Sequence, residues 1–272
     1  MLIAQITDTH IKLPGKLAYR RVDTAAMLRD CVAAVQALKQ PPDLIVLTGD
    51  LVDLGSAEEY AHLKSILAPL QQRIIAIPGN HDARDAMREA FGDGGYLPAE
   101  GYLQFVIDDE YPVRIVGLDT VVAGQGGGAL CAERLRWLDD TLARAPQAPT
   151  LVMMHHPPFD TGIGHMDALG LAGKDGFAAI MQRHPQVDLI ICGHLHRSIH
   201  ATVGGRRALC CPSPAHQVAL DIDPAAPSAF RMEPPGFMLH WWDGAGLVSH
   251  VAAIGAYDGP FPFFDAKGGL ID

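Results

Sequence analysis

The stretch Ile77-Pro78-Gly79-Asn80-His81-Asp82 determines how the rest of this sequence is interpreted. It closes an apolar run, residues 74–77, that is typical of a buried strand. Pro78 and Gly79 end this strand and allow the backbone to turn sharply. An amide, an imidazole and a carboxylate therefore follow at the carboxyl end of a strand, which is where ligands bind in open α/β sheets.

Apolar runs that end in Asp or His residues occur four more times along the chain. The polar residues at these ends are Asp8 and His10, Asp50, His155 and His156, and His194 and His196. Runs that are apolar throughout indicate strands covered on both faces. The sequence predicts strands at residues 2–6, 44–47, 74–77, 102–107, 113–118, 150–154 and 188–192, and helices at residues 22–39, 56–67, 83–90, 131–143 and 176–183. We therefore expect an α/β fold, a layered sandwich with its helices outside.

The residues at the strand ends form a set of potential metal ligands. Asp8 and His10, like His194 and His196, are two positions apart, so in extended backbone both side chains would point the same way. Taken singly, an Asp or His after a strand is more often a cap or a surface residue. Five such ends in one chain favour a metal site, and oxygen and imidazole donors without thiolate suit Mn²⁺, Fe or Zn²⁺.

Length and composition are those of an ordinary soluble enzyme. The 272 residues suffice for one large α/β domain with a small appendage, and 49% of them are hydrophobic. The net charge of −10 argues against a nucleic-acid-binding surface, although it leaves open a local cation-lined pocket. No apolar stretch approaches the roughly 20 residues of a membrane span, so we expect no membrane partner.

The cysteines and the N-terminus suggest a cytoplasmic location. The five cysteines are Cys31, Cys131, Cys192, Cys210 and Cys211. Their odd number favours reduced core thiols over a disulfide framework. Met1 leads directly into a strand without a basic leader, so no signal peptide is expected.

The motifs at the strand ends resemble the five-part signature of calcineurin-like metallophosphoesterases. They are Asp8-x-His10, Gly49-Asp50, Gly79-Asn80-His81-Asp82, His155 and Gly193-His194-x-His196, and they run from residue 8 to residue 196 of 272. Met154-His155-His156-Pro157-Pro158 and Ala215-His216-Gln217-Val218 resemble class III cyclic nucleotide phosphodiesterases, in particular their glycerophosphodiesterase branch. The cysteines that can tie dimers of that branch together are missing from residues 51–55, so any dimer here would be non-covalent.

This resemblance implies an architecture and a set of residue roles. The fold would be a layered αββα metallophosphoesterase sandwich, with residues 1–197 as catalytic domain and residues 198–272 as last core strands plus a small cap and dimerisation region. One metal ion would be held by Asp8, His10 and His196, and the second by Asn80, His155 and His194, with Asp50 bridging both. His81 would lie beside the scissile phosphate as leaving-group acid or charge stabiliser. Asn80, His81 and His216 would contact substrate, although His216 could instead be a surface histidine on a cap loop.

The implied function is hydrolysis of small phosphodiesters by a metal-activated hydroxide at a binuclear centre. The substrates would be 3′,5′-cyclic nucleotides or glycerophosphodiesters. A phosphomonoesterase or protein phosphatase on the same site is the alternative, followed by a nuclease, which the charge disfavours, and a non-catalytic interaction scaffold. A homo-oligomer is expected through the aromatic residues after position 198, which could otherwise pack onto the sandwich.

Several residues keep two interpretations. His156 could be a ligand in place of His155, but strand alternation would let only one face the metals, and the family pattern favours His155. His165 and Asp167 could line the pocket. Tyr19, Arg20 and Arg21 could reach a phosphate, although a solvated loop is the interpretation we favour.

Overall fold

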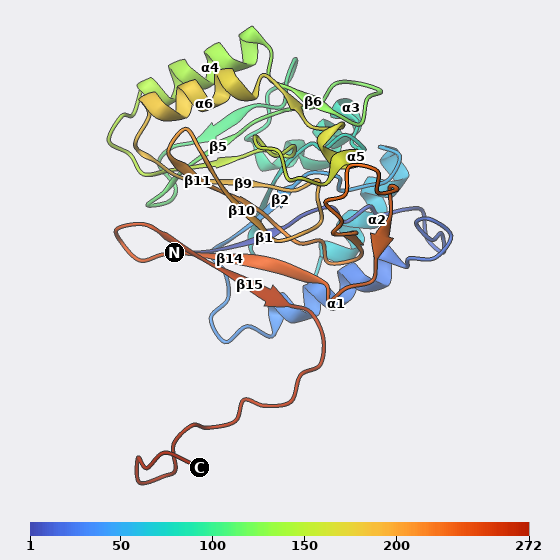
Figure 1. Cartoon of the computed structure of the whole chain (residues 1–272), viewed down its shortest axis with the longest axis vertical. Coiled ribbons are helices and arrows are strands. Elements are labelled where there is room, and N and C mark those ends of the chain that lie inside the picture. Colours follow the sequence, from blue (N-terminus) through green and yellow to red (C-terminus); the bar gives the residue numbers. More distant parts are fainter. Residues whose placement is uncertain (272) are drawn as a thin grey trace.

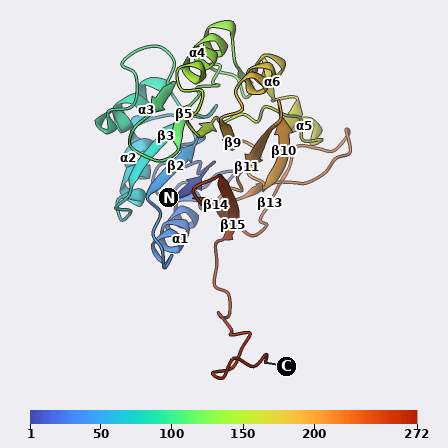
Figure 2. The same cartoon turned by 90° about the vertical axis from the view of Figure 1, so that its left-hand side faces the viewer.

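Two β-sheets face each other in the computed structural model, which describes residues 1–271 (Figures 1 and 2). The first sheet has five strands in the order β15-β14-β1-β2-β3. They are β1 (Leu2–Ile6), β2 (Leu44–Thr48), β3 (Arg73–Ile77), β14 (Gly236–Trp242) and β15 (Leu247–Ala253). Because β1, β2 and β3 are parallel, their carboxyl ends meet at one edge of the sheet.

The second sheet has six strands in the order β10-β11-β9-β7-β5-β4. They are β4 (Phe105–Ile107), β5 (Arg114–Gly117), β7 (Thr150–Met153), β9 (Val187–Cys192), β10 (Ile199–Val203) and β11 (Arg206–Cys210). The predicted strands at residues 102–107 and 113–118 correspond to the antiparallel pair β4 and β5, while β5, β7, β9 and β11 run parallel. Both sheets thus present parallel strand ends to a site between them.

Helices cover the outer face of each sheet (Figure 1). The first sheet packs against α1 (Thr24–Gln36), α2 (Ala57–Leu67) and α3 (Arg84–Phe91), and the second against α4 (Ala132–Ala143) and α6 (Lys174–Arg183). A third apolar layer, with Ile3, Val46 and Leu189, fills the space between the sheets. Strands buried on both faces explain the uniformly apolar runs, and the predicted αββα sandwich is confirmed.

Short elements complete the chain, and most of them were not predicted. They are η1 (Gly92–Gly94), α5 (Gly164–Asp167), β6 (Gly128–Ala129), β8 (Leu171–Ala172), β12 (Gln217–Val218) and β13 (Phe230–Arg231). Two- to four-residue elements carry too little periodicity for the sequence to reveal them. By contrast, the capping box at the start of α2, with Ser56 and Glu59 bonded reciprocally, follows from its sequence signature.

The segment after residue 198 contributes to both sheets. Strands β10 and β11 join the six-stranded sheet, and β14 pairs with β1 in the five-stranded sheet. Beyond β15 the chain leaves the sandwich as an extended tail (Figures 1 and 2). The predicted boundary between residues 197 and 198 stays a prediction. Within residues 1–271, no helix has the length and apolar character needed to cross a bilayer.

The five cysteines are free thiols, but they are not all core residues. Four are fully buried, whereas Cys131 is partly exposed at the start of α4, so the expectation of core thiols is wrong there. The backbone N–H of Arg134, with help from its side chain, stabilises the thiolate and lowers the pKa of Cys131 to about 7. This is the usual behaviour of a thiol at a helix N-terminus.

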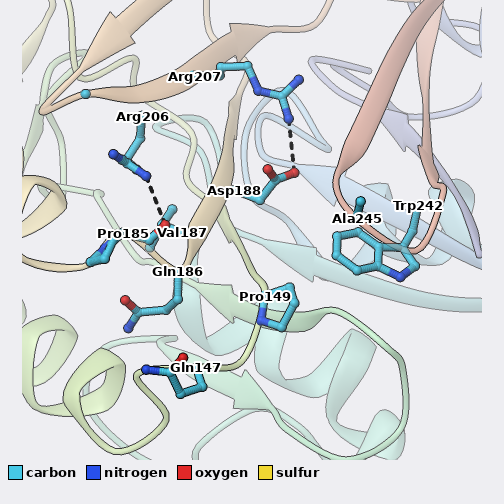
Figure 3. Close-up of a pocket in the computed structure, with 11 residues that line it drawn as sticks. Gln147, Pro149, Pro185, Gln186, Val187, Asp188, Arg206, Arg207, Trp242 and Ala245 are labelled. Carbon is cyan, nitrogen blue, oxygen red and sulfur yellow. Dashed lines mark hydrogen bonds and ion pairs between the residues drawn. The ribbon is translucent and has the colours of Figure 1, made fainter.

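One carboxylate ties the two sheets together at the edge opposite the carboxyl ends of the parallel strands. Asp188, at the start of β9, accepts a hydrogen bond from Arg207 Nη2 at 3.0 Å (Figure 3) and another from the backbone N–H of Leu247 at 2.6 Å. Leu247 begins β15 in the other sheet. Since the Asp188 side chain is 26% exposed, the bond to the backbone N–H matters more for stability than the ion pair with the exposed arginine.

Replacing Asp188 with alanine should therefore lower the free energy of unfolding by about 1–3 kcal/mol, because the N–H of Leu247 loses its partner. The measurement is urea unfolding followed by circular dichroism. Asp140→Ala, on the exposed face of α4, is the matched control and should change stability by less than about 0.5 kcal/mol. Equal effects of the two substitutions would mean that Asp188 does not hold the sheets together.

Candidate metal centre

The predicted ligands come together where the carboxyl ends of five strands meet. Asp8 and His10 follow β1, Asp50 follows β2, Asn80 follows β3, His155 follows β7, and His194 and His196 follow β9. Six of these seven residues belong to groups whose potential ligand atoms lie within 4.8 Å of one another, and Asn80 contacts His155. The structure therefore brings all seven predicted ligands together.

Most of these residues do not have the extended backbone that their spacing predicts. Seven non-glycine residues between positions 1 and 271 have positive φ. Five of them are predicted ligands: Asp8 (53°), His10 (43°), Asp50 (50°), His194 (71°) and His196 (53°). The prediction of extended backbone at these positions is thus wrong, and His194 and His196 lie in different groups.

The left-handed conformation costs about 1–2 kcal/mol per residue and persists only where its surroundings enforce it. Here the backbone N–H of Asp8 donates to Gly49 O at 3.0 Å, and that of His10 donates to Asp50 O at 2.9 Å. The backbone N–H of His194 donates to the carboxylate of Asp8 at 3.0 Å. Strain concentrated in this way is typical of a functional site.

The first group consists of Asp8, His10 and His196. Nε2 of His196 lies 3.2 Å from Nε2 of His10 and 3.4 Å from Oδ1 of Asp8. Nδ1 of His196 donates to the backbone carbonyl of His216 at 2.9 Å. Because that bond occupies the Nδ1 proton, the lone pair of the neutral ring lies on Nε2, where a metal would bind.

The second group surrounds His155. Its Nε2 lies 3.2 Å from Oδ1 of Asn80 and 3.4 Å from Oδ2 of Asp50, and its Nδ1 donates to Thr48 O at 2.8 Å. The same Oδ2 of Asp50 lies 3.7 Å from Nε2 of His10 in the first group. Asp50 is therefore placed between the two groups, as a bridging carboxylate must be.

The buried charges require compensation. Burial raises the pKa of Asp8 to about 7. Burial also disfavours the charged forms of Asp50 and His155, but their mutual attraction outweighs it, keeping the pKa of Asp50 well below its usual range and raising that of His155 to about 10. Nε2 of His194 is buried without a hydrogen-bond partner among the described residues. Two buried carboxylates and several imidazoles that converge in this way fit cations, and oxygen and nitrogen ligands of these kinds suit divalent transition metals.

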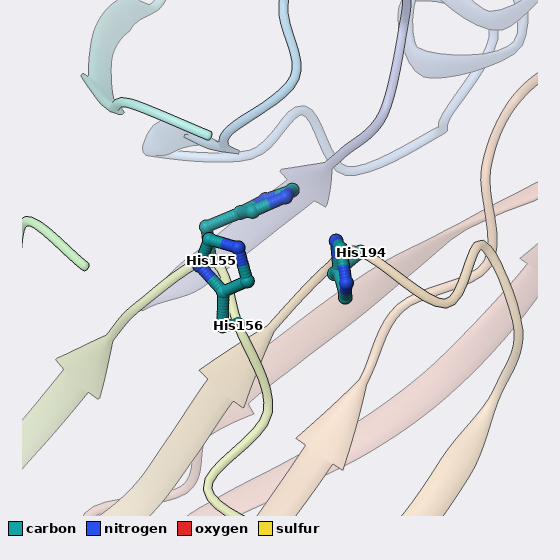
Figure 4. Close-up of side chains that lie close together, drawn as sticks. All are labelled: His155, His156 and His194. Carbon is teal, nitrogen blue, oxygen red and sulfur yellow. The ribbon is translucent and has the colours of Figure 1, made fainter. Parts of the chain in front are cut away.

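His156 lies beside this centre but is already engaged. Figure 4 shows its ring next to those of His155 and His194. Strand alternation does not turn it away, because β7 ends at Met153. Both of its ring nitrogens have protein partners, Nδ1 with Thr120 Oγ1 at 2.8 Å and Nε2 with Gly126 O at 3.2 Å. These contacts support the interpretation of His156 as a packing residue next to the ligands.

His81 occupies a different position from the ligands. Its backbone N–H donates to Oδ1 of Asp50 at 2.9 Å, and its Nδ1 donates to Asp53 O at 2.8 Å. Nε2 is thus the ring nitrogen left for another partner. Burial disfavours the charged ring, but Asp50 and the carbonyl of Asp53 outweigh this and raise the pKa of His81.

Asp82, the last residue of the opening motif, has a structural role that the sequence did not reveal. Its Oδ2 accepts the N–H of Gly79 at 2.8 Å, and its Oδ1 accepts the hydroxyl of Tyr60 at 2.7 Å. A carboxylate in this place fixes the turn that carries Asn80 and His81. The sequence alone could not distinguish this role from metal binding, because Asp82 stands only two residues after Asn80 in the motif.

A cavity of about 380 Å³ opens beside the centre. Besides five of the seven predicted ligands and His81, it is lined by Tyr19, His165, Met166, Leu169, His216, Val218, Ser228, Ala229 and Phe230. His216 is only 2% exposed, so it is not a surface histidine, and burial lowers its pKa to about 4. Asp167 does not line the cavity; it accepts hydrogen bonds from the backbone of Thr161 and Gly162 and holds the loop of α5 in place.

Sequence comparison then decides the family. A profile described as "Calcineurin-like phosphoesterase" matches residues 1–198. The chain belongs to the calcineurin-like phosphoesterase family. The resemblance based on the strand-end motifs is thereby confirmed.

Relatives in this family cover most of the chain. A protein of Arcobacter nitrofigilis named "Probable glycerophosphodiester phosphodiesterase GpdQ" is 40% identical over 274 residues and covers 100% of both chains. The 3′,5′-cyclic adenosine monophosphate phosphodiesterase CpdA of Escherichia coli K12 is 33% identical over 78% of this chain and 75% of its own. A dimetal phosphatase from Danio rerio shares the fold, with a TM-score of 0.63 at 14% identity over 94% of this chain and 99% of its own.

The geometry predicts how metal binding responds to substitution. Metal-depleted protein reloaded with Mn²⁺ should bind two ions per chain, measured by elemental analysis after desalting. His196→Ala and His155→Ala should each reduce this number towards one, because each removes a ligand from only one of the two predicted ligand sets. His200→Ala, at an exposed position, should keep both ions. A wild-type protein that binds one ion, or variants that retain two, would contradict the division into two groups.

Proposed function

We propose that this protein hydrolyses small phosphodiesters, 3′,5′-cyclic nucleotides or glycerophosphodiesters, with two bound transition-metal ions. The observation that carries the proposal is the position of Asp50, whose Oδ2 lies 3.7 Å from Nε2 of His10 and 3.4 Å from Nε2 of His155. Family membership and the names of the relatives, which include glycerophosphodiester and cyclic adenosine monophosphate phosphodiesterases, support the substrate class.

Each group of ligands would hold one ion. Asp8, His10 and His196 would form one set, Asn80, His155 and His194 would form the other, and Asp50, which lies near His10 and His155, would belong to both. Such a pair of ions, which could be Mn²⁺, Fe or Zn²⁺, neutralises the phosphate and acidifies a water molecule. Asn80 contributes a neutral oxygen, which limits the negative charge that an anionic diester meets.

His81 supplies the remaining chemistry. The hydrogen bond from its Nδ1 to the carbonyl of Asp53 orients the ring, and its environment favours the protonated form. Because His81 lines the cavity and has Nε2 available, it can donate a proton or a hydrogen bond to the departing oxygen. It is the residue that we assign to catalysis beside the metal ligands.

A comparison of rates on one Mn²⁺-loaded preparation tests this function. We expect 3′,5′-cyclic AMP or glycerophosphoethanolamine to be hydrolysed faster than 4-nitrophenyl phosphate, a monoester. Asn80→Ala should abolish the diester activity. His81→Ala should reduce kcat about 10²–10⁴-fold for these alkoxide leaving groups, and much less for bis(4-nitrophenyl) phosphate, whose leaving group needs no proton.

His200→Ala is the control for these variants, because its side chain is exposed and lies outside the cavity. A faster monoester rate would replace this proposal with a phosphomonoesterase. Equal losses on both kinds of leaving group would remove His81 as the proton donor.

We also infer that the protein is a homo-oligomer. Strand β15 lies at the edge of its sheet, and Val251 on it is 51% exposed. In the tail, Phe261 and Phe263 are 74% and 79% exposed. An unpaired edge strand and a cluster of exposed aromatic rings are features that association usually covers. The free thiols support a reducing compartment such as the cytoplasm, and the charge supports the absence of a nucleic-acid partner.

Light scattering after size-exclusion chromatography should therefore give a mass at least twice the 29.2 kDa of one chain. Replacing Phe261, Phe263 and Phe264 with serine should reduce that mass, because it removes apolar surface from the contact. Replacing the exposed Leu54, which lies outside this segment, is the control and should leave the mass unchanged. A wild-type mass of a single chain would exclude the oligomer.

A further inference from the structure

We propose that the turn at residues 18–21 and strand β13 form a subsite for a second phosphate group, carried by the alcohol part of the phosphodiester. Arg21 and Arg231 would be its specificity-determining residues. The inference rests on the proposed function, since it assumes that the first phosphate binds at the metal centre. It concerns which diesters the protein prefers.

The turn has a strained backbone that its sequence does not favour. Arg21 N donates to Ala18 O at 3.0 Å, and the two central residues, Tyr19 and Arg20, have φ of 50° and 57°. These are the φ signs of a type I′ turn, which normally contains Gly, Asn or Asp. Apart from the five predicted metal ligands, Tyr19 and Arg20 are the non-glycine residues with positive φ within positions 1–271. Strain that is kept in this turn and in the metal centre suggests that both serve the same function.

The strained turn is held by buried contacts. Ala18 and Val22 pair by two backbone hydrogen bonds of 2.9 Å and pack with Ala215 in a small apolar cluster. The ring of Tyr19 lies 5.1 Å from that of Phe230 and 5.2 Å from that of His216. The turn is therefore anchored at Ala18 and Val22 against the wall of the metal cavity, while the side chains of residues 19–21 are exposed, as expected of the solvated loop favoured from the sequence.

A second hollow adjoins the metal cavity across Phe230. This groove, about 540 Å³ in volume, is lined by Arg21, Phe230, Arg231, Met232 and Glu233, and Phe230 also lines the metal cavity. Glu233 is paired with Arg197 at 2.7 Å. Arg21 and Arg231 are exposed, and neither has a carboxylate within 4.0 Å in the part of the chain that the structure describes. The groove thus offers two uncompensated guanidinium groups.

The charge distribution indicates what this groove would bind. No Lys or Arg is among the residues that line the metal cavity, so a second phosphate there would have no cation besides the metals. The chain as a whole carries a net charge of −10, which repels polyanions. Arg21 and Arg231, in the groove next to the metal cavity, make the local charge positive. Guanidinium groups match phosphate oxygens in geometry and charge. The rings of Tyr19 and Phe230 would contact the organic part between the two phosphates.

A binding measurement separates this proposal from the activity. Calorimetry on Mn²⁺-loaded wild-type protein should give a Kd for thymidine 3′,5′-bisphosphate that is lower than the Kd for thymidine 5′-phosphate by about tenfold or more, the effect of one charge-assisted contact. Arg21→Gln/Arg231→Gln should bring the ratio of the two Kd values close to one. Arg21→Lys/Arg231→Lys, which keeps the charges, should restore part of the preference.

Arg136→Gln/Arg144→Gln is the matched control, because it removes two exposed arginines from around α4 and should keep the wild-type ratio. A loss of active protein in a variant would lower the apparent number of binding sites for both ligands and would leave the ratio of the two Kd values unchanged. Equal Kd values in wild-type protein, no binding of either ligand, or a preference that survives Arg21→Gln/Arg231→Gln would overturn the subsite. Because no turnover is needed, these outcomes are distinct from a failure of the rate comparison.

Discussion

The interaction on which the rest of this structure depends is the close approach of the turns that follow β2 and β3. Oδ1 of Asp50 accepts the backbone N–H of His81, while its Oδ2 faces His10 and His155. A Cβ atom at Gly79 would lie 2.2 Å from both the backbone nitrogen and Oδ1 of Asp50. Only glycine therefore allows the two turns to approach this closely, and the central carboxylate owes its position to a missing side chain.

The same constraint recurs where β9 meets β1, and it joins the two sheets. A Cβ atom at Gly193 would lie 2.1 Å from Thr7 Oγ1 and 2.7 Å from Asp8 Oδ2. The N–H of the following His194 reaches the same carboxylate. Predicted ligands from both sheets are thus brought close together by backbone contacts, so the candidate metal centre is as rigid as the sandwich that carries it.

The sequence could predict those features of the site that depend on neighbouring residues in the chain, but not those that depend on contacts with distant residues. Uniformly apolar runs report burial on both faces, so strands such as Ile74 to Ile77 and their polar ends could be identified directly. The left-handed backbone at Asp8 and His10 could not, because the neighbouring turn imposes it on residues that would not choose it alone. For the same reason, adjacent histidines carry no signal of their own: His155 and His156 differ in the partners of their ring nitrogens, and those partners lie far away in sequence.

Chemistry and specificity are built from different parts of the chain. The predicted ligands follow strands of the sandwich, whereas the outer walls of the cavity come from the turn at Tyr19, the short helix α5 and strand β13. Loops and short elements tolerate sequence change far better than buried strands, because they contribute little to the core. The same kind of metal centre can therefore act on different diesters when the walls of the cavity differ. In agreement with this, two relatives with similar sequence identity to this chain are named as a glycerophosphodiester phosphodiesterase and a cyclic adenosine monophosphate phosphodiesterase. The preference of this chain must accordingly be sought in its walls, where a strained turn lies beside two arginines that have no carboxylate partner among residues 1–271.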